Sequence, residues 1–118
     1  MIAFSIAWGQ QLYVGTSHTV AWDEVYEEGT ISYEVWLRDA NGDTYFVAET
    51  FDTEYTVDIS NYGGEMVVGV RTKQLLYDEM FYSEYNWSDV NGEETPNPFV
   101  LLPSSPVVPV PNNFRVIQ

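Results

Sequence analysis

Apolar and polar side chains alternate along much of the chain between residues 20 and 90, and this alternation predicts β-strands. In EYTVDIS at 54–60 and GEMVVGVRT at 64–72, apolar side chains recur at every second position. ISYEVWLRD at 31–39 and HTVAWD at 18–23 repeat the pattern. A two-residue period is that of a strand with one buried face. We therefore expect an all-β protein with almost no helix.

Turn-forming residues divide these runs into separate strands. Asn41-Gly42 stands between the 31–38 run and TYFVAET at 44–50, and Asn-Gly between alternating runs is the signal of a hairpin closed by a type I′ turn. With MIAFSIAW at 1–8 as a first strand, the pattern predicts seven strands around one core. The residues expected in that core are Phe4, Ile6, Val20, Trp22, Tyr33, Val35, Tyr55, Val57, Ile59, Val68 and Val70.

The order of the strands resembles that of a fibronectin type III domain. The segments that carry the resemblance are VAWD at 20–23 (similar to the family's second strand with its buried Trp), SYEVWL at 32–37 (third strand), EYTVDI at 54–59 (fifth strand), and GVRT at 69–72 followed by SEYNWSD at 83–89 (last two strands). The resemblance implies a seven-stranded antiparallel two-sheet Greek-key sandwich over residues 1–95. Because Met66 stands where the family usually places a Tyr, a related immunoglobulin-like sandwich is the alternative fold. Either scaffold alone names no partner.

The chain is strongly acidic, with eighteen acidic residues against four basic ones and a net charge of −14. This charge repels phosphate backbones and anionic lipid headgroups, so neither nucleic acid nor a membrane surface is an expected partner. The acids are scattered over turns and outward strand positions, which favours a role in solubility; attraction of a basic partner or of cations is the alternative. The chain has no Cys, so disulfide bonds do not hold the fold.

Few residues suit catalysis. His18 is the only His in the chain and shares its strand parity with Val20 and Trp22, so we expect a partly buried residue at the start of a strand. A hydrolytic triad would need it beside an independently positioned Ser and acid. The chain has so many carboxylates that the availability of a pair for glycoside cleavage does not indicate a glycosidase. We therefore predict no catalytic residue, no cofactor and no enzymatic activity.

One turn begins like a calcium-binding loop. Asp39-Ala40-Asn41-Gly42-Asp43 offers oxygen ligands at alternate positions, but Thr44 and Thr50 stand where Gly and Glu would complete the motif. Our interpretation is a solvated turn without a metal site. Asn86-Trp87-Ser88 fits an N-glycan acceptor, and we expect Asn86 to lie on the last strand instead.

The segment KQLLYDEMFY at 73–82, between the sixth and seventh predicted strands, is long and apolar for a hairpin loop. Loops on rigid sandwiches commonly carry recognition, and in fibronectin-like scaffolds the equivalent loop is a common recognition site. Alternatively, the hairpin extends and packs these side chains on its own domain. The candidate binding residues of this loop are Leu75, Leu76, Tyr77, Met80, Phe81 and Tyr82.

All six prolines of the chain lie in an apolar tail that runs from residue 96 to residue 118. Pro lacks a backbone N–H, so we expect this arm to stay out of any central strand and to be extended. Such a segment is expected to dock on its own sandwich or on a neighbour. A linker before a further repeat is the alternative, because PNNFRVI at 111–117 is similar to an opening strand. The candidate binding residues of the arm are Phe99, Val100, Leu101, Leu102, Val107, Val108, Phe114 and Ile117.

These features predict a non-catalytic binding or structural subunit of a larger assembly, anchored by its C-terminal arm. A short sandwich with an extended arm and no signal peptide resembles the small accessory or decoration proteins of tailed-bacteriophage particles. Expected partners are proteins of such an assembly, further copies of the chain, or a surface glycan. The expected location is a virion surface or the extracellular space, and no run of residues is apolar enough for a transmembrane span. The alternative is an adhesion or carbohydrate-binding module of a longer secreted protein.

Overall fold

The computed structural model describes the backbone of residues 3–4, 10–104 and 108–117, and the side chains of residues 10–104 and 108–117. These residues form ten β-strands and no helix. Accordingly, the described part of the chain contains no helix that could cross a membrane. The strands are β1 (Ala3–Phe4), β2 (Gln11–Val14), β3 (Ser17–Ala21), β4 (Thr30–Asp39), β5 (Thr44–Thr50), β6 (Glu54–Asp58), β7 (Met66–Leu76), β8 (Glu79–Tyr82), β9 (Asn86–Trp87) and β10 (Phe99–Leu102).

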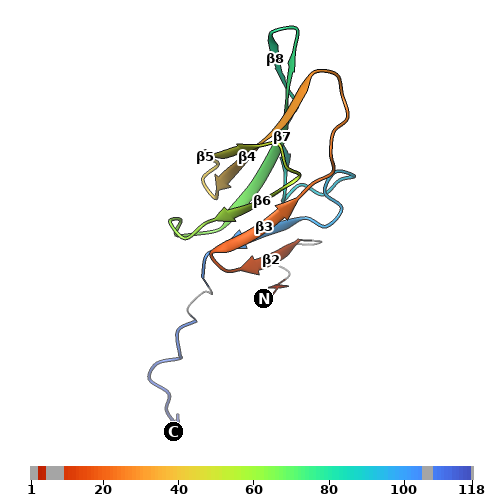
Figure 1. The fold of residues 1–118 in the computed structure, drawn as a ribbon. Helices are drawn as coiled ribbons and strands as arrows, with labels where there is room; N and C mark the ends of the chain where they lie inside the picture. The colour runs from red at the N-terminus through yellow and green to blue at the C-terminus, as the bar shows by residue number, and fades with distance from the viewer. Residues whose placement is uncertain (1–2, 5–9, 105–107, 118) are drawn as a thin grey trace.

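The strands form two sheets (Figure 1). The larger sheet has the order β1-β2-β10-β7-β4-β5, and β8 and β9 also pair with β7. The smaller sheet consists of β3 and β6 and lies over one face of the larger one. The prediction of an all-β, two-sheet protein is confirmed. The described residues contain ten strands rather than the expected seven, and β2 and β10 run parallel rather than antiparallel.

The main core lies between the two sheets, where side chains of one parity along each strand meet. Val35 and Leu37 of β4 face Val57 of β6 there, together with Met66 of β7 and Leu101 of β10. Of the expected core residues, Tyr33, Val35, Val57, Ile59 and Val68 are buried, Val20, Trp22, Tyr55 and Val70 are partly buried, and the side chains of Phe4 and Ile6 lie outside the described residues. The prediction thus named five of the eleven hydrophobic side chains that are buried in the described residues; it missed Leu12, Leu37, Met66, Val67, Val100 and Leu101.

Strand β10 corrects the prediction for the first part of the C-terminal arm. Residues 99–102 form a central strand, parallel to β2 and antiparallel to β7. The four residues FVLL contain no Pro, and Pro98 and Pro103 stand immediately outside them. The strand therefore keeps all its backbone donors: Phe99 N–H, for example, donates to the Ser88 carbonyl over 2.7 Å. The sandwich thus extends past residue 95 to Leu102.

Two hairpin turns differ from the expected turn chemistry. At Asp39–Asp43, Gly42 N–H donates to the Asp39 carbonyl and Gly42 alone has a positive φ, of 88°. This is a type I turn followed by a one-residue bulge, not the type I′ turn that we predicted from Asn-Gly. The β7–β8 turn has φ of 49° at Tyr77 and 63° at Asp78, so a type I′ arrangement occurs where the sequence lacks its usual signal.

Candidate binding surfaces

Aromatic side chains cover the outer face of the larger sheet, away from β3 and β6. We call Trp36, Phe46, Tyr82, Tyr85 and Trp87 the aromatic strip. Trp36 of β4 lies opposite Phe46 of β5 in the strand register. Its ring centroid is 5.4 Å from that of Phe46 and 5.7 Å from that of Tyr85, and Tyr85 stacks on Trp87 at 5.1 Å. These spacings are those of favourable aromatic pairs, so the rings support one another.

Gly69 provides the space for one end of the strip. A β-carbon at this position would lie 2.4 Å from the ring of Trp87, which is far inside van der Waals contact. Trp87 pairs with Gly69 across β9 and β7, and its indole covers the bare backbone there. A Gly in the middle of an apolar strand is the sequence signal from which such a close approach could have been predicted.

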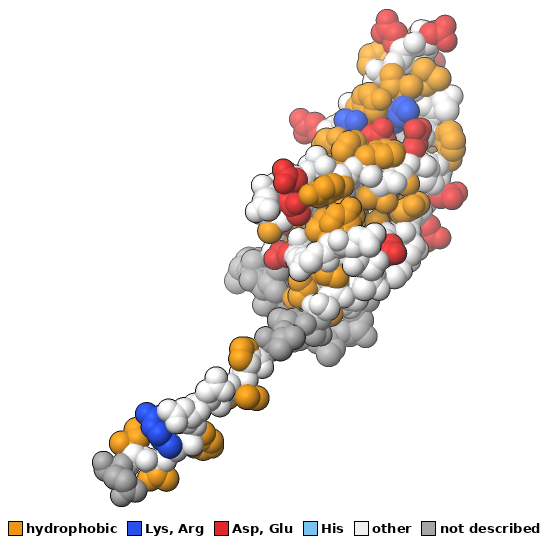
Figure 2. Space-filling view, turned by 90° about the vertical axis from the view of Figure 1, so that its left-hand side faces the viewer, with side chains coloured by type: hydrophobic (Ala, Val, Ile, Leu, Met, Phe, Trp, Pro, Cys, Tyr) orange, Lys and Arg blue, Asp and Glu red, His pale blue; other side chains and the backbone are white. Residues whose placement is uncertain are grey.

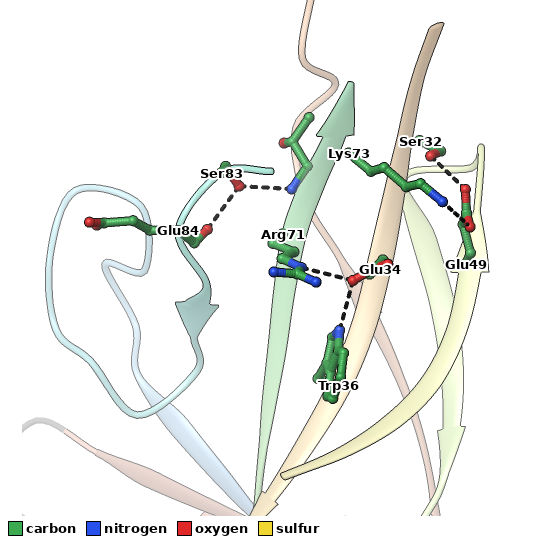
Figure 3. A network of polar contacts seen from close by, with 9 residues as sticks. Ser32, Glu34, Trp36, Glu49, Arg71, Lys73, Ser83 and Glu84 are labelled. Atoms are coloured by element: carbon green, nitrogen blue, oxygen red, sulfur yellow. Dashed lines mark hydrogen bonds and ion pairs between the residues drawn. The ribbon is translucent and has the colours of Figure 1, made fainter. Parts of the chain in front are cut away.

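Arg71 joins the strip to the sheet beneath it. Its guanidinium lies 4.1 Å from the ring centroid of Tyr82 and 4.7 Å from that of Tyr85. Its Nε also donates to Glu34 Oε1 over 2.8 Å, and the same oxygen accepts the indole N–H of Trp36 (Figure 3). Glu34 is only 8% exposed, and a buried carboxylate needs partners of this kind. The network holds three rings of the strip, Trp36, Tyr82 and Tyr85, in fixed positions.

The other two cations of the body lie on the same face, each with an acidic partner. Arg38 pairs with Asp89 and lies 4.8 Å from the centroid of Trp87. Glu49 accepts from Ser32 and from Lys73 at 3.0 Å, and these hydrogen bonds, that of Ser32 first, hold the pKa of its carboxyl below the usual value. The bond to Glu49 raises the pKa of Lys73. Figure 2 shows hydrophobic, cationic and acidic side chains next to one another on the body.

The predicted loop at 73–82 is a regular hairpin of β7 and β8 that projects from one end of the body (Figure 1). Five of its six candidate residues are exposed, from 39% at Leu75 to 85% at Tyr77, and Leu76 is half-buried. Leu75 lies opposite Met80, two residues beyond Lys73 on β7, so this pair continues the face of the aromatic strip toward the hairpin tip. Phe81 and Leu76 have the other parity.

The arm candidates fall into two groups. Val100 and Leu101 are each 1% exposed within the sandwich, and Phe99 and Leu102 are partly buried beside them, so these four are not available to a partner. Val107 lies outside the described residues. We call residues 108–117 the C-terminal segment. Its apolar side chains, Val108, Val110, Phe114, Val116 and Ile117, are 77% to 98% exposed.

An open cleft, which sequence reasoning did not predict, lies between β3 of the smaller sheet and the larger sheet. Its volume is about 980 Å³. We call it the β3 cleft and define it by its apolar lining residues Val20, Trp22, Val68, Val70 and Phe99. Trp22 Nε1 is buried here and has no hydrogen-bond partner within the described part of the chain. A buried donor without an acceptor is costly, so the cleft has unmet bonding capacity.

The remaining candidates serve the fold. His18 is buried, as expected, and its Nε2 lies 2.7 Å from the Gly15 carbonyl. Asp39 accepts from two backbone N–H groups of its own turn and from the Tyr45 hydroxyl, a hydrogen bond that lowers the pKa of its carboxyl. Asn86 lies on β9, as expected, and its amide bonds to Glu94 and Thr95. Across the described ranges, no three acidic or His side chains are grouped to hold a metal ion.

Comparison with protein-family models, with curated proteins and with solved structures finds no significant match to this chain. Its function is therefore argued from its own surfaces.

Proposed function

We propose that this protein is a non-catalytic binding and structural subunit of a larger assembly, anchored by its C-terminal segment. Its body is a sandwich of the immunoglobulin-like class, for which the strand order resembling fibronectin type III is the more specific assignment. The two-sheet architecture and the partly buried Trp22, which packs against the main core, support that assignment. The specific subunit that we propose is an accessory protein on the surface of a virion.

The observation that carries the proposal is the exposure of the C-terminal segment. Phe114 is 98% exposed and Ile117 84%, although both are apolar and the body nearby has a well-packed core. Burying one such side chain contributes about 1.5–3 kcal/mol before the cost of ordering the segment. A segment with several of them gains most by docking on another molecule, which gives the protein its point of attachment.

The test keeps the whole chain and changes only the segment. Phe114→Asp combined with Val116→Asp places charges on exposed side chains, so the thermal stability of the body stays unchanged. In its native host, the tagged wild-type chain is expected to sediment in a high-molecular-mass particle and the double variant to remain at the top of the gradient. Phe114→Leu is the matched control and sediments like wild type. Equal sedimentation of wild type and double variant would overturn the proposal.

A second candidate, a carbohydrate-binding adhesion module, is favoured by the aromatic strip. Exposed rings on a sheet face beside charged groups suit the stacking of sugar rings with hydrogen bonds at their edges. This function predicts that Trp36→Ala abolishes binding to an array of glycans, while Phe114→Asp leaves that binding intact. A wild-type chain that binds no glycan on the array excludes it.

A further inference from the structure

The smaller sheet has an unpaired edge along β3. Trp22 N–H donates to the Thr53 carbonyl, and the Thr16 carbonyl accepts from Ile59 N–H, so residues of even number direct their backbone groups toward the β6 side. Because these directions alternate along a strand, Ser17, Thr19 and Ala21 direct theirs to the opposite side. Within the described residues, β3 pairs with no strand on that side. This edge is a template for one more strand.

The β3 cleft meets this same edge at the C-terminal end of β3, where Val20 and Ala21 line it. Val20 and Trp22 of the β3 region line it from the smaller sheet, and Val68 and Val70 line it from β7. An added strand beside β3 would place every second side chain in the cleft and bury these apolar walls. Its backbone carbonyls would also bring acceptors near the unpartnered Nε1 of Trp22. The cleft and the strand edge therefore suit one occupant: an extended apolar segment.

The charge at the cleft narrows the choice of occupant. Four acidic residues line it and are exposed: Asp23, Glu84, Glu93 and Glu94. A segment with acidic side chains would be repelled, whereas one with a cation and no acid would be attracted.

The C-terminal segment has these properties. It is apolar, it contains Arg115, and it has no acidic residue. Asn113, with φ of 56°, lies outside the extended region and would have to change its backbone conformation to join a strand. In a strand, Phe114 and Val116 would point to one face and Arg115 and Ile117 to the other. Four prolines stand between β10 and Phe114, and Pro-rich chain acts as a stiff spacer that resists folding back. The segment leaves the body at the end opposite to the β8 hairpin (Figure 1).

We propose that residues 112–117 of one copy add as a strand to the β3 edge of a second copy and fill its β3 cleft. This inference rests on the proposed function and names the partner as another copy of this chain. The surface that donates differs from the surface that accepts, so the contact is heterologous. Contacts of this kind build rings or open chains of subunits.

Two proline substitutions make a matched test. Thr19 and Thr56 lie opposite each other in the β3–β6 pair, and their hydroxyl groups share one hydrogen bond of 2.7 Å. Both are positions whose backbone groups point away from the partner strand, Thr19 toward the free edge of β3 and Thr56 toward the free edge of β6. Thr19→Pro and Thr56→Pro therefore remove the same hydroxyl contact. Each also removes one backbone N–H that makes no hydrogen bond within the β3–β6 pair. Only Thr19→Pro blocks strand addition at the cleft.

The measurement is sedimentation equilibrium of the purified full-length chain over a wide range of concentrations. We expect reversible association of the wild type, weakened at least about tenfold by Thr19→Pro and by Phe114→Asp, and changed less than about threefold by Thr56→Pro. A synthetic peptide of residues 108–117 is expected to dissociate the assemblies. If Thr19→Pro does not fold, Phe114→Asp and the peptide decide the question.

Several outcomes would overturn the inference. One is a wild-type chain that is monomeric at every concentration. A tail that folds back onto its own body would give this result. Another is equal weakening by the two proline variants, and a third is a peptide without effect. If the purified chain is monomeric while the tail substitutions still release it from the native particle, the partner is a different protein and the proposed function stands. If the tail substitutions leave sedimentation of the chain with the native particle unchanged, the proposed function itself fails.

Discussion

Leu101→Ala tests whether the first part of the proline-rich tail belongs to the sandwich. Leu101 is 1% exposed, and on β10 it pairs with Tyr13 of β2 and Met66 of β7. Truncating a Leu at such a site loses its transfer free energy and leaves a cavity, a cost of about 3 kcal/mol. For a domain of about 100 residues, this corresponds to a fall in Tm of about 12–24 °C. The loss is a large fraction of the about 5–15 kcal/mol of a typical domain.

The assay is thermal and urea unfolding of the full-length chain, followed by circular dichroism. The matched control is Phe114→Ala, which removes a larger side chain from the same tail at a position that is 98% exposed. This control is expected to change the free energy of unfolding by less than about 0.5 kcal/mol. A loss below about 1 kcal/mol for Leu101→Ala, or an equal loss for both variants, would refute the placement of β10 between β2 and β7.

Three further variants probe other parts of the structure. Tyr77→Asn combined with Asp78→Gly relieves two positive φ angles and should raise the free energy of unfolding by about 1 kcal/mol; an unchanged or lower Tm contradicts this. Gly69→Ala forces the covering indole aside and should cost about 1–3 kcal/mol and alter the near-ultraviolet circular dichroism, and the absence of both effects would show that the ring does not lie there. The hydrogen bond from Ser32 lowers the pKa of Glu49, so its stabilisation is present above about pH 4.5 and is lost as the pH falls through the lowered value. The difference in the free energy of unfolding between wild type and Glu49→Gln should therefore decrease at acidic pH. A difference that increases there would be inconsistent with this contact.

Local patterns in the sequence predicted the strands whose partners lie near them in the chain. The β4–β5 hairpin and the burial of Val35 and Val57 follow from two-residue alternation, because one face of the sheet is buried and the other is exposed to solvent. Strand β10 was missed because its parallel partner β2 lies far away in the sequence and leaves no local signal. Counting prolines over the whole tail also concealed the four-residue gap between Pro98 and Pro103.

The binding surfaces were only partly predictable. The sequence predicted that Asn86 lies on a strand. The outer position of Trp36 follows from its alternation with the buried Val35 and Leu37. The Arg71–Glu34 ion pair was not predictable, because it depends on the register between β4 and β7, which alternation alone does not fix. The β3 cleft was also missed, because a cleft arises from the separation of two sheets and not from any segment of sequence.

The charge of the body limits how an apolar tail can act. All eighteen acidic residues precede Thr95, so two bodies that approach each other repel, and Arg115 supplies one attractive charge at short range. At physiological ionic strength the repulsion is screened beyond about 8 Å, which lets a tail that projects from its body reach a partner before the bodies meet. The free energy of docking must then come from burying side chains such as Phe114 and Val116, at about 1.5–3 kcal/mol each before ordering costs. The partner proposed above offers both an unpaired strand edge and an apolar cleft, so that these side chains can be buried while the backbone of the tail forms hydrogen bonds.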